Sequence, residues 1–201
     1  MVLDGNEAFL DQAQEDYRIL FYKPVHSKAE QVHRSLARVI AVFGGNRSSK
    51  TFTGSAEVAR RVLGVNPMSL PDAPLPPGPL KLVWVVSEDY PTSRDVAEPN
   101  LFQWIPDSEI SKWDKQNRIL MLRNGCAIHF KSCDSGWKKF KGRAIDLAWF
   151  DEEPDEMVWR EVRARTIDRG GRIIFTATPF EGFNWLYQEV YLRWRYGADK
   201  N

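Results

Sequence analysis

The order of apolar and polar positions predicts a chain that alternates between helices and strands. Apolar side chains recur at helical spacing in two early segments, whereas a short β-branched run between positions 38 and 43 is typical of a strand. A further helical pattern then runs to Leu63 and ends at Gly64. The first half of the chain is therefore predicted to contain helices over residues 6–21, 27–35 and 51–63, with a strand over 38–43.

The second half carries more strand signals. The run over 80–86 is apolar without alternation, so we expect a strand buried on both faces. Residues 118–131 predict a hairpin whose Asn124-Gly125 turn is of type I′. Strands are also predicted over 145–150 and 172–176, with a helix over 154–167 that has Pro154 in its first turn. Strands separated by helices predict a mostly parallel sheet, covered on both faces, that binds its ligand at the carboxyl ends of the strands.

Proline is concentrated between the first long helix and the next strand. Six prolines fall within residues 66–79. This composition predicts an exposed loop with polyproline character. A partner-binding motif is the alternative, and an ordinary surface loop is favoured over it.

Composition narrows the class of protein. The 201 residues suit one domain, and a net charge of +1 supplies no global field that would require nucleic acid as a partner. Cys126 and Cys133 stand seven apart without a paired Cys-x-x-Cys, which indicates neither a zinc site nor a disulfide scaffold. The polar N-terminus and the lack of an eighteen-residue apolar span predict a soluble, intracellular protein.

A loop of small polar residues follows the first predicted strand. It consists of Gly44, Gly45, Asn46, Arg47, Ser48, Ser49, Lys50 and Thr51. The pattern is that of the phosphate-binding loop G-x-x-x-x-G-K-[ST], with Ser49 at the second glycine. A strand precedes this loop and a helix follows it, an arrangement that would aim backbone N–H groups at an anion. Lys50 would reach the β- and γ-phosphates, and the Thr51 hydroxyl would hold Mg²⁺. The alternative is a polar surface turn.

Acidic residues follow the apolar strand at 147–150. Asp151 is placed to hold Mg²⁺ beside the phosphate loop. Glu152 would point differently, because side chains alternate at a strand end, and could orient or deprotonate a water. The alternative is a helix start enriched in acids, which explains Glu153 and Asp155 well but Asp151 poorly.

A third motif, Thr176-Ala177-Thr178-Pro179, directly follows a strand. Hydroxyl groups there can bond a phosphate or an attacking water, although on its own the motif reads as a turn. The three motifs in this order resemble the ATPase domain of large terminase subunits, the DNA-packaging motors of tailed bacteriophages. Further matching segments are Tyr22-Lys-Pro24 with His33, the Asn-Gly hairpin, Phe140-Lys-Gly142, Val158-Trp-Arg160, Ala164 to Asp168, and Gly182 to Tyr187.

The resemblance implies a P-loop NTPase fold of the additional-strand, catalytic-glutamate type. It assigns phosphate and metal contacts to Lys50 and Thr51, the Mg²⁺ carboxylate to Asp151, and catalysis to Glu152. It makes residues 176–178 a coupling motif that links hydrolysis to movement of the next domain.

Other family positions are matched less closely. Arg47 lies where the family keeps an arginine in the phosphate loop, which implies a catalytic role in sensing or stabilising γ-phosphate charge within the same subunit. Ser49 replaces the usual glycine. The family's adenine-reading glutamine falls on Ala29, and Gln31 is the nearest substitute.

A ring motor also implies an arginine donated by the neighbouring subunit. The basic run over 138–143 is the natural source, with Arg143 as the candidate, although a solvated basic face explains the run equally well. A second basic set consists of Arg160, Arg163, Arg165, Arg169 and Arg172. For that set, pairing with nearby acids is favoured over DNA tracking.

The implied function is Mg²⁺-dependent ATP hydrolysis that drives double-stranded DNA into a procapsid. Implied partners are the portal protein, the small terminase subunit and further copies in a homo-oligomeric, pentameric ring, with the isolated domain monomeric. The expected location is the host cytoplasm, docked on the procapsid. Residues 1–201 would form one motor domain, with an adenine-side segment over 1–36, a Pro-rich surface loop over 66–80 and no room for the nuclease domain.

Two rival functions remain open. A helicase-like translocase uses the same motifs but needs a second motor domain. A nucleotide-gated binding switch without turnover has no need of Glu152.

Overall fold

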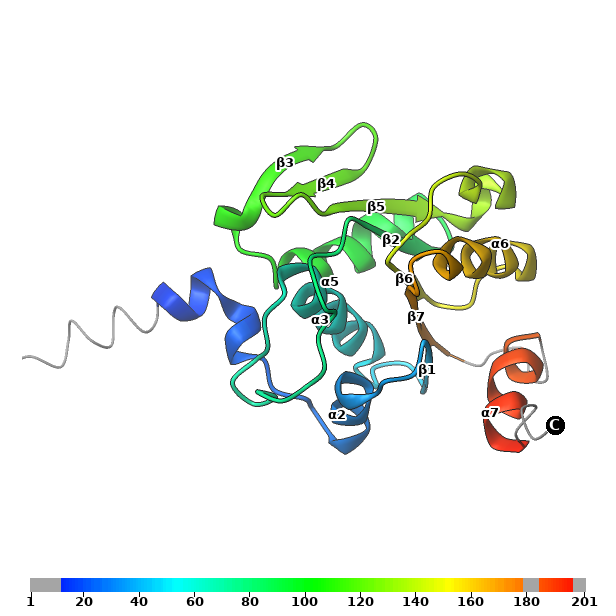
Figure 1. Ribbon diagram of the computed structural model, residues 1–201, viewed down its shortest axis with the longest axis horizontal. Helices are drawn as coiled ribbons and strands as arrows, with labels where there is room; N and C mark the ends of the chain where they lie inside the picture. The colour runs from blue at the N-terminus through cyan, green and yellow to red at the C-terminus, as the bar shows by residue number, and fades with distance from the viewer. Residues whose placement is uncertain (1–11, 179–184, 197–201) are drawn as a thin grey trace, which may run out of the picture.

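The computed structural model describes residues 12–178 and 185–196, which form a seven-stranded sheet flanked by helices (Figure 1). The strand order is β1-β7-β6-β2-β5-β4-β3. Strands β1, β7, β6, β2 and β5 run parallel, and β4 and β3 continue the sheet in antiparallel fashion. The strands are β1 (Val39–Phe43), β2 (Leu82–Ser87), β3 (Ile110–Asp114), β4 (Ile119–Leu122), β5 (Ala127–Ser132), β6 (Leu147–Asp151) and β7 (Arg172–Ala177).

The position of β7 defines the type of sheet. It lies between β1, which leads into the phosphate loop, and β6, which ends at Asp151. An added strand between these two is the feature that the additional-strand class requires, so the predicted fold class is confirmed. Because the strands are parallel, their carboxyl ends meet at one edge of the sheet.

The hairpin at the far edge is larger than the sequence predicts. Strands β4 and β5 pair as expected, but β3 adds a further antiparallel strand that the sequence analysis did not predict. The predicted type I′ turn is wrong, since that turn needs two positive φ angles and only Gly125 (φ 87°) has one. Instead, Gly125 N–H donates to Leu122 O and Leu122 N–H donates to Cys126 O, which closes a three-residue loop.

The helices largely follow the predicted pattern. They are α2 (Ser27–Arg34), α3 (Lys50–Leu63), α4 (Tyr90–Thr92), α5 (Glu98–Phe102), α6 (Glu156–Ile167) and α7 (Arg193–Tyr196), joined by helical turns η1 (Arg18–Phe21), η2 (Ser93–Ala97), η3 (Asp107–Glu109), η4 (Cys133–Ser135), η5 (Trp137–Phe140) and η6 (Tyr187–Leu192).

Two helix predictions need correction. Pro154 lies before the N-cap of α6, Asp155, and not in the first helical turn. Within the predicted helix over 6–21, residues 12–16 are helical and η1 is a 3₁₀ turn, while residues 1–11 lie outside the described part. The motif residues Pro179 and Gly182 also lie outside it.

The sheet separates two hydrophobic cores. Helices α3 and α5 cover one face and α6 covers the other, as Figure 1 shows. Every residue of β6 is buried, and two consecutive residues of this strand, Trp149 and Phe150, face opposite cores. No helix among residues 12–178 and 185–196 is long and apolar enough to cross a membrane.

The proline-rich loop is less exposed than predicted. Leu70 and Ala73 are buried in the core under α3. The carbonyl of Pro74 accepts hydrogen bonds from Arg60 and Arg61 on the same helix. The loop therefore packs along α3, because its apolar residues and carbonyl groups both find partners there.

Candidate active site at the phosphate loop

The carboxyl ends of β6 and β7 and the start of α3 bring the three sequence motifs together. The hydroxyl of Thr51 donates a 2.8 Å hydrogen bond to Oδ1 of Asp151, 100 residues away in the chain. The hydroxyl of Thr176 donates to the same oxygen at 2.9 Å. Thr51 at the start of α3 and Thr176 near the end of β7 therefore converge on the Asp151 carboxylate at the end of β6.

The loop over 44–49 has the shape of an anion cradle. The Lys50 ammonium folds back on it and donates to the carbonyl of Gly45 at 3.0 Å. The hydroxyl of Ser48 is buried and has no hydrogen-bond partner within the described structure. A Cβ at Gly44 would lie 2.5 Å from that hydroxyl, so a larger residue there would displace the Ser48 side chain. An orphaned polar group beside a helix N-terminus and a lysine fits a phosphate group.

Ser49 takes the conformation that the missing glycine would provide. Its φ of 62° and ψ of 21° lie in the left-handed region, and it forms the N-cap of α3 without a side-chain bond. Arg47 is also left-handed, with φ 61°. A non-glycine residue in this region costs about 1–2 kcal/mol. The loop therefore keeps its glycine-type shape at the expense of backbone strain.

Asp151 is suited to a hard divalent cation. Burial raises the pKa of its carboxyl group to about 6, although the hydrogen bonds from Thr51 and Thr176 oppose that shift. A cation beside the carboxylate would favour its charged form. No cluster of three or more His, Cys, Asp or Glu residues able to hold a metal exists in the described part of the chain. A magnesium ion here would take its remaining ligands from phosphate and water, as is usual for this metal.

A residue that the sequence analysis missed supports this carboxylate. Trp149 Nε1 donates a buried 2.8 Å hydrogen bond to the Thr176 hydroxyl. An indole N–H can only donate, so the single proton of Thr176 is directed to Asp151 or, at 3.2 Å, to the carbonyl of Phe150. Trp149 thereby limits the Thr176 proton to these two acceptors, of which Asp151 is the closer.

The close packing of Trp149 and Thr176 against α3 depends on a glycine inside that helix. A Cβ at Gly54 would lie 2.6 Å from Trp149 Nε1 and 2.7 Å from Thr176 Cγ2. A glycine in a helix interior is the one sequence signal for this close packing. The tryptophan itself reads as an ordinary core residue.

Glu152 is held apart from Asp151. Its φ of 77° is unusual for a non-glycine residue. Its carboxylate accepts hydrogen bonds from the backbone N–H of Thr178 at 2.7 Å and from the Thr178 hydroxyl at 3.3 Å. Asp151 thus points to Thr51 and Glu152 points to Thr178, so the two side chains diverge as expected, although the left-handed backbone of Glu152 just after β6, and not the alternation of a regular strand, sets its direction.

Other candidate residues lie elsewhere. Gln31 is exposed on α2, opposite the face formed by the buried Ala29, Val32 and His33. Arg47 is exposed at the loop, close to where a phosphate would lie. Arg143 is exposed and precedes β6, whose far end carries Asp151. Within one chain, the structure therefore does not bring Arg143 to the phosphate loop.

Comparison with known proteins identifies the family. The sequence profile described as "Terminase large subunit, T4likevirus-type, N-terminal" matches residues 42–194. The large terminase subunit of Salmonella phage P22 is 27% identical over 176 residues, a match that covers 70% of this chain and 35% of that protein. The chain thus corresponds to about a third of the length of this curated relative.

Solved structures show the same fold. An arginine-to-alanine variant of the large terminase ATPase domain of Thermus phage P74-26 has a TM-score of 0.64 at 18% identity, covering 85% of this chain and 71% of that one. The large terminase of a thermophilic bacteriophage, in complex with ADP, has a TM-score of 0.59 at 16% identity, covering 84% and 42%. With its profile match over more than half its length, this chain belongs to the family of terminase large subunits, in their N-terminal region.

Proposed function

We propose that the chain is the ATP-hydrolysing motor domain of a phage DNA-packaging terminase. The observation that carries the proposal is the convergence of Thr51 and Thr176 on the buried Asp151 carboxylate, beside an anion cradle with an orphaned hydroxyl. The family membership and the fold of the terminase ATPase domains support it. Adenosine nucleotide is the favoured substrate, since ADP is bound to one relative of the same fold.

Each residue of the site has a separate role in this proposal. Lys50 leaves Gly45 to neutralise the β- and γ-phosphates, and the loop N–H groups position them. Thr51 and Asp151 hold Mg²⁺, which when bound supplies positive charge to the phosphate oxygens. Glu152 orients the attacking water and accepts its proton. Arg47, exposed at the loop, senses the γ-phosphate.

Coupling to DNA forms the next part of the proposal. Glu152 and Thr178 are hydrogen-bonded, so the group that activates water also contacts the residue directly after β7. Movement of Glu152 toward a water would release Thr178 and change the segment after it. We propose that this change drives double-stranded DNA toward the procapsid in a ring docked on the portal. Arg143 would complete the site of a neighbouring copy, a role that its exposure and its place before β6, away from Asp151 at the end of that strand, support.

Release of phosphate from ATP by the purified chain, with and without duplex DNA, tests the proposal. We expect Mg²⁺-dependent release that Lys50→Ala abolishes, while Arg160→Gln, which alters an exposed ion pair on α6, leaves it unchanged. ATP binding without release would favour the binding switch. Strand separation of duplex DNA would favour a helicase-like translocase.

A further inference from the structure

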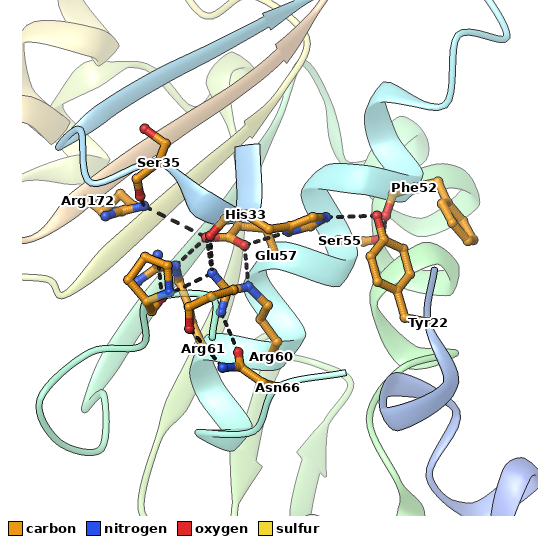
Figure 2. Close-up of polar contacts among 12 residues, drawn as sticks. Tyr22, His33, Ser35, Phe52, Ser55, Glu57, Arg60, Arg61, Asn66 and Arg172 are labelled. Atoms are coloured by element: carbon orange, nitrogen blue, oxygen red, sulfur yellow. Dashed lines mark hydrogen bonds and ion pairs between the residues drawn. The ribbon is translucent and has the colours of Figure 1, made fainter. Parts of the chain in front are cut away.

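A second group of charged residues is buried at the other end of α3. The carboxylate of Glu57 accepts hydrogen bonds from His33 Nδ1 at 2.7 Å and from Arg60 Nε at 2.5 Å, and Arg61 Nε also donates to it. Arg172 Nη1 lies 3.9 Å from the same carboxylate. Figure 2 shows these side chains converging on Glu57 from α2, α3 and β7.

The charges in this cluster do not balance. Glu57 and Arg60 are fully buried, and the side chains of Arg61 and Arg172 are only 7% and 14% exposed. Three guanidinium groups thus face one carboxylate, which leaves a surplus of two positive charges. Burial, followed by the charge of Arg61, lowers the pKa of Arg172 to about 10. Buried charge without a partner is unfavourable, so an additional anion would stabilise the cluster.

A second carboxylate, Asp146, lines the same region but is already paired. Asp146 Oδ2 accepts hydrogen bonds from Arg169 Nη1 at 2.9 Å and from the backbone N–H groups of Lys81 and Leu82 at 2.7 and 2.8 Å. Asp146 therefore neutralises Arg169 and accepts the backbone hydrogen bonds at the start of β2. Its negative charge is thus offset by Arg169 and leaves the positive surplus around Arg61 and Arg172 unchanged.

A cavity of about 360 Å³ opens beside the surplus charge. Its lining includes Arg61 and Arg172, the Arg169–Asp146 pair and the proline-rich segment over 74–80. Among the described residues, the Arg172 side chain hydrogen-bonds only to the carbonyl of Ser35 at 2.9 Å, because its 3.9 Å separation from Glu57 is too long for a hydrogen bond. The Arg172 guanidinium therefore keeps donor groups for a ligand in the cavity.

We propose that this cavity is a second oxyanion site, which takes a dianionic phosphate group between Arg61 and Arg172. The planar donor fork of arginine matches phosphate oxygens, and a phosphomonoester carries about −1.5 to −2 charges near pH 7, which balances the surplus. The site lies at the amino ends of β2, β6 and β7, whereas the phosphate loop lies at the carboxyl edge. It is thus independent of the nucleotide site and of the proposed hydrolysis.

Titration of inorganic phosphate into the Lys50→Ala variant tests this site, because that substitution removes the lysine of the phosphate loop. The readouts are heat of binding and thermal unfolding, with sodium chloride of equal ionic strength as the reference. We expect saturable binding and a rise in Tm, both at least tenfold weaker when Arg172→Gln is added. Arg160→Gln, which removes an exposed guanidinium, is the matched control and should change neither.

A second variant and a competition with DNA complete the test. If Arg172→Gln unfolds, Arg172→Lys keeps the charge but removes the fork, and it should weaken phosphate binding severalfold in a folded protein. Duplex DNA added to the phosphate-saturated protein identifies the source: displacement of phosphate means that the site takes backbone phosphates, and no displacement means that it takes free phosphate. Absence of saturable phosphate binding, or binding that survives Arg172→Gln unchanged, would overturn the proposal. No ATP is used, so the outcome does not depend on hydrolysis.

Discussion

The Glu152 carboxylate and the backbone N–H of Thr178 form a 2.7 Å hydrogen bond between the acidic strand end and the residues after β7. The backbone of Glu152 is strained, with φ 77°, and its N–H donates to the carbonyl of Thr176. Two motifs that lie 26 residues apart are therefore joined through both side chain and main chain. This link gives the proposed motor a physical connection between water activation and the following segment.

Trp149→Phe should weaken metal binding without unfolding the protein. The change removes the indole donor, so the Thr176 hydroxyl is no longer directed to Asp151. Loss of one buried hydrogen bond of about 1 kcal/mol corresponds to roughly a fivefold lower affinity for Mn²⁺–nucleotide. Electron paramagnetic resonance of Mn²⁺ measures this affinity.

Trp84→Phe is the matched control, since Trp84 is a buried tryptophan of neighbouring β2 that faces the other core. Equal metal affinity in wild type and Trp149→Phe would show that Trp149 only fills space.

Gly54→Ala should destabilise the protein, against the usual trend. Alanine normally stabilises a helix interior by about 1 kcal/mol relative to glycine. Here the added methyl group would clash with Trp149 and Thr176, which lie 2.6 and 2.7 Å from its position. Thermal unfolding should therefore show a lower Tm, and a higher Tm would mean that this packing is looser than described.

The structure also shows which features the sequence could predict. Apolar runs identified β2, β6 and β7, because strands buried on both faces carry a strong local signal, and β1, which is only partly buried, was identified from its β-branched run. Strand β3 was missed, since its half-exposed residues pack only once β4 is beside it. The role of Trp149 depends on Thr176, 27 residues away, and no local pattern reveals such a pair. The charge surplus at Glu57 likewise forms only when β7 brings Arg172 to α3.

Glu57 should stabilise the fold in a pH-dependent way. Burial alone would raise its pKa, but the hydrogen bond from His33 and the charges of Arg60 and Arg61 lower it from 4.5 to about 2. Its contribution is therefore complete above pH 4.5 and is lost as the pH falls toward 2. Glu57→Gln should cost ~3–5 kcal/mol near neutral pH, because it leaves buried guanidinium groups without their carboxylate.

Chemical denaturation across this pH range measures the Glu57 effect. Glu30→Gln, which alters the exposed pair with Arg34, should change stability by less than about 1 kcal/mol. A Glu57→Gln protein as stable as Glu30→Gln would contradict the account of the cluster.

Arg143 is expected to act on a neighbouring copy. The specific ATPase activity should then rise with protein concentration, and Arg143→Ala should remove that rise while nucleotide affinity stays nearly unchanged. Mixing Arg143→Ala with Lys50→Ala should restore activity, because a mixed interface joins an intact loop to an intact arginine. If wild-type activity rises with concentration but the mixture stays inactive, another residue of the basic run at 138–141 is the donor.

The most direct test of the central claim compares ATP binding and phosphate release in wild type and Glu152→Gln. The amide can still accept the Thr178 hydrogen bond but cannot take a proton from water. We predict unchanged nucleotide affinity and a loss of about 10²–10⁴ in turnover, while Glu156→Gln, on the exposed side of α6, turns over as wild type does. Hydrolysis by Glu152→Gln at the wild-type rate would contradict the role assigned to this carboxylate.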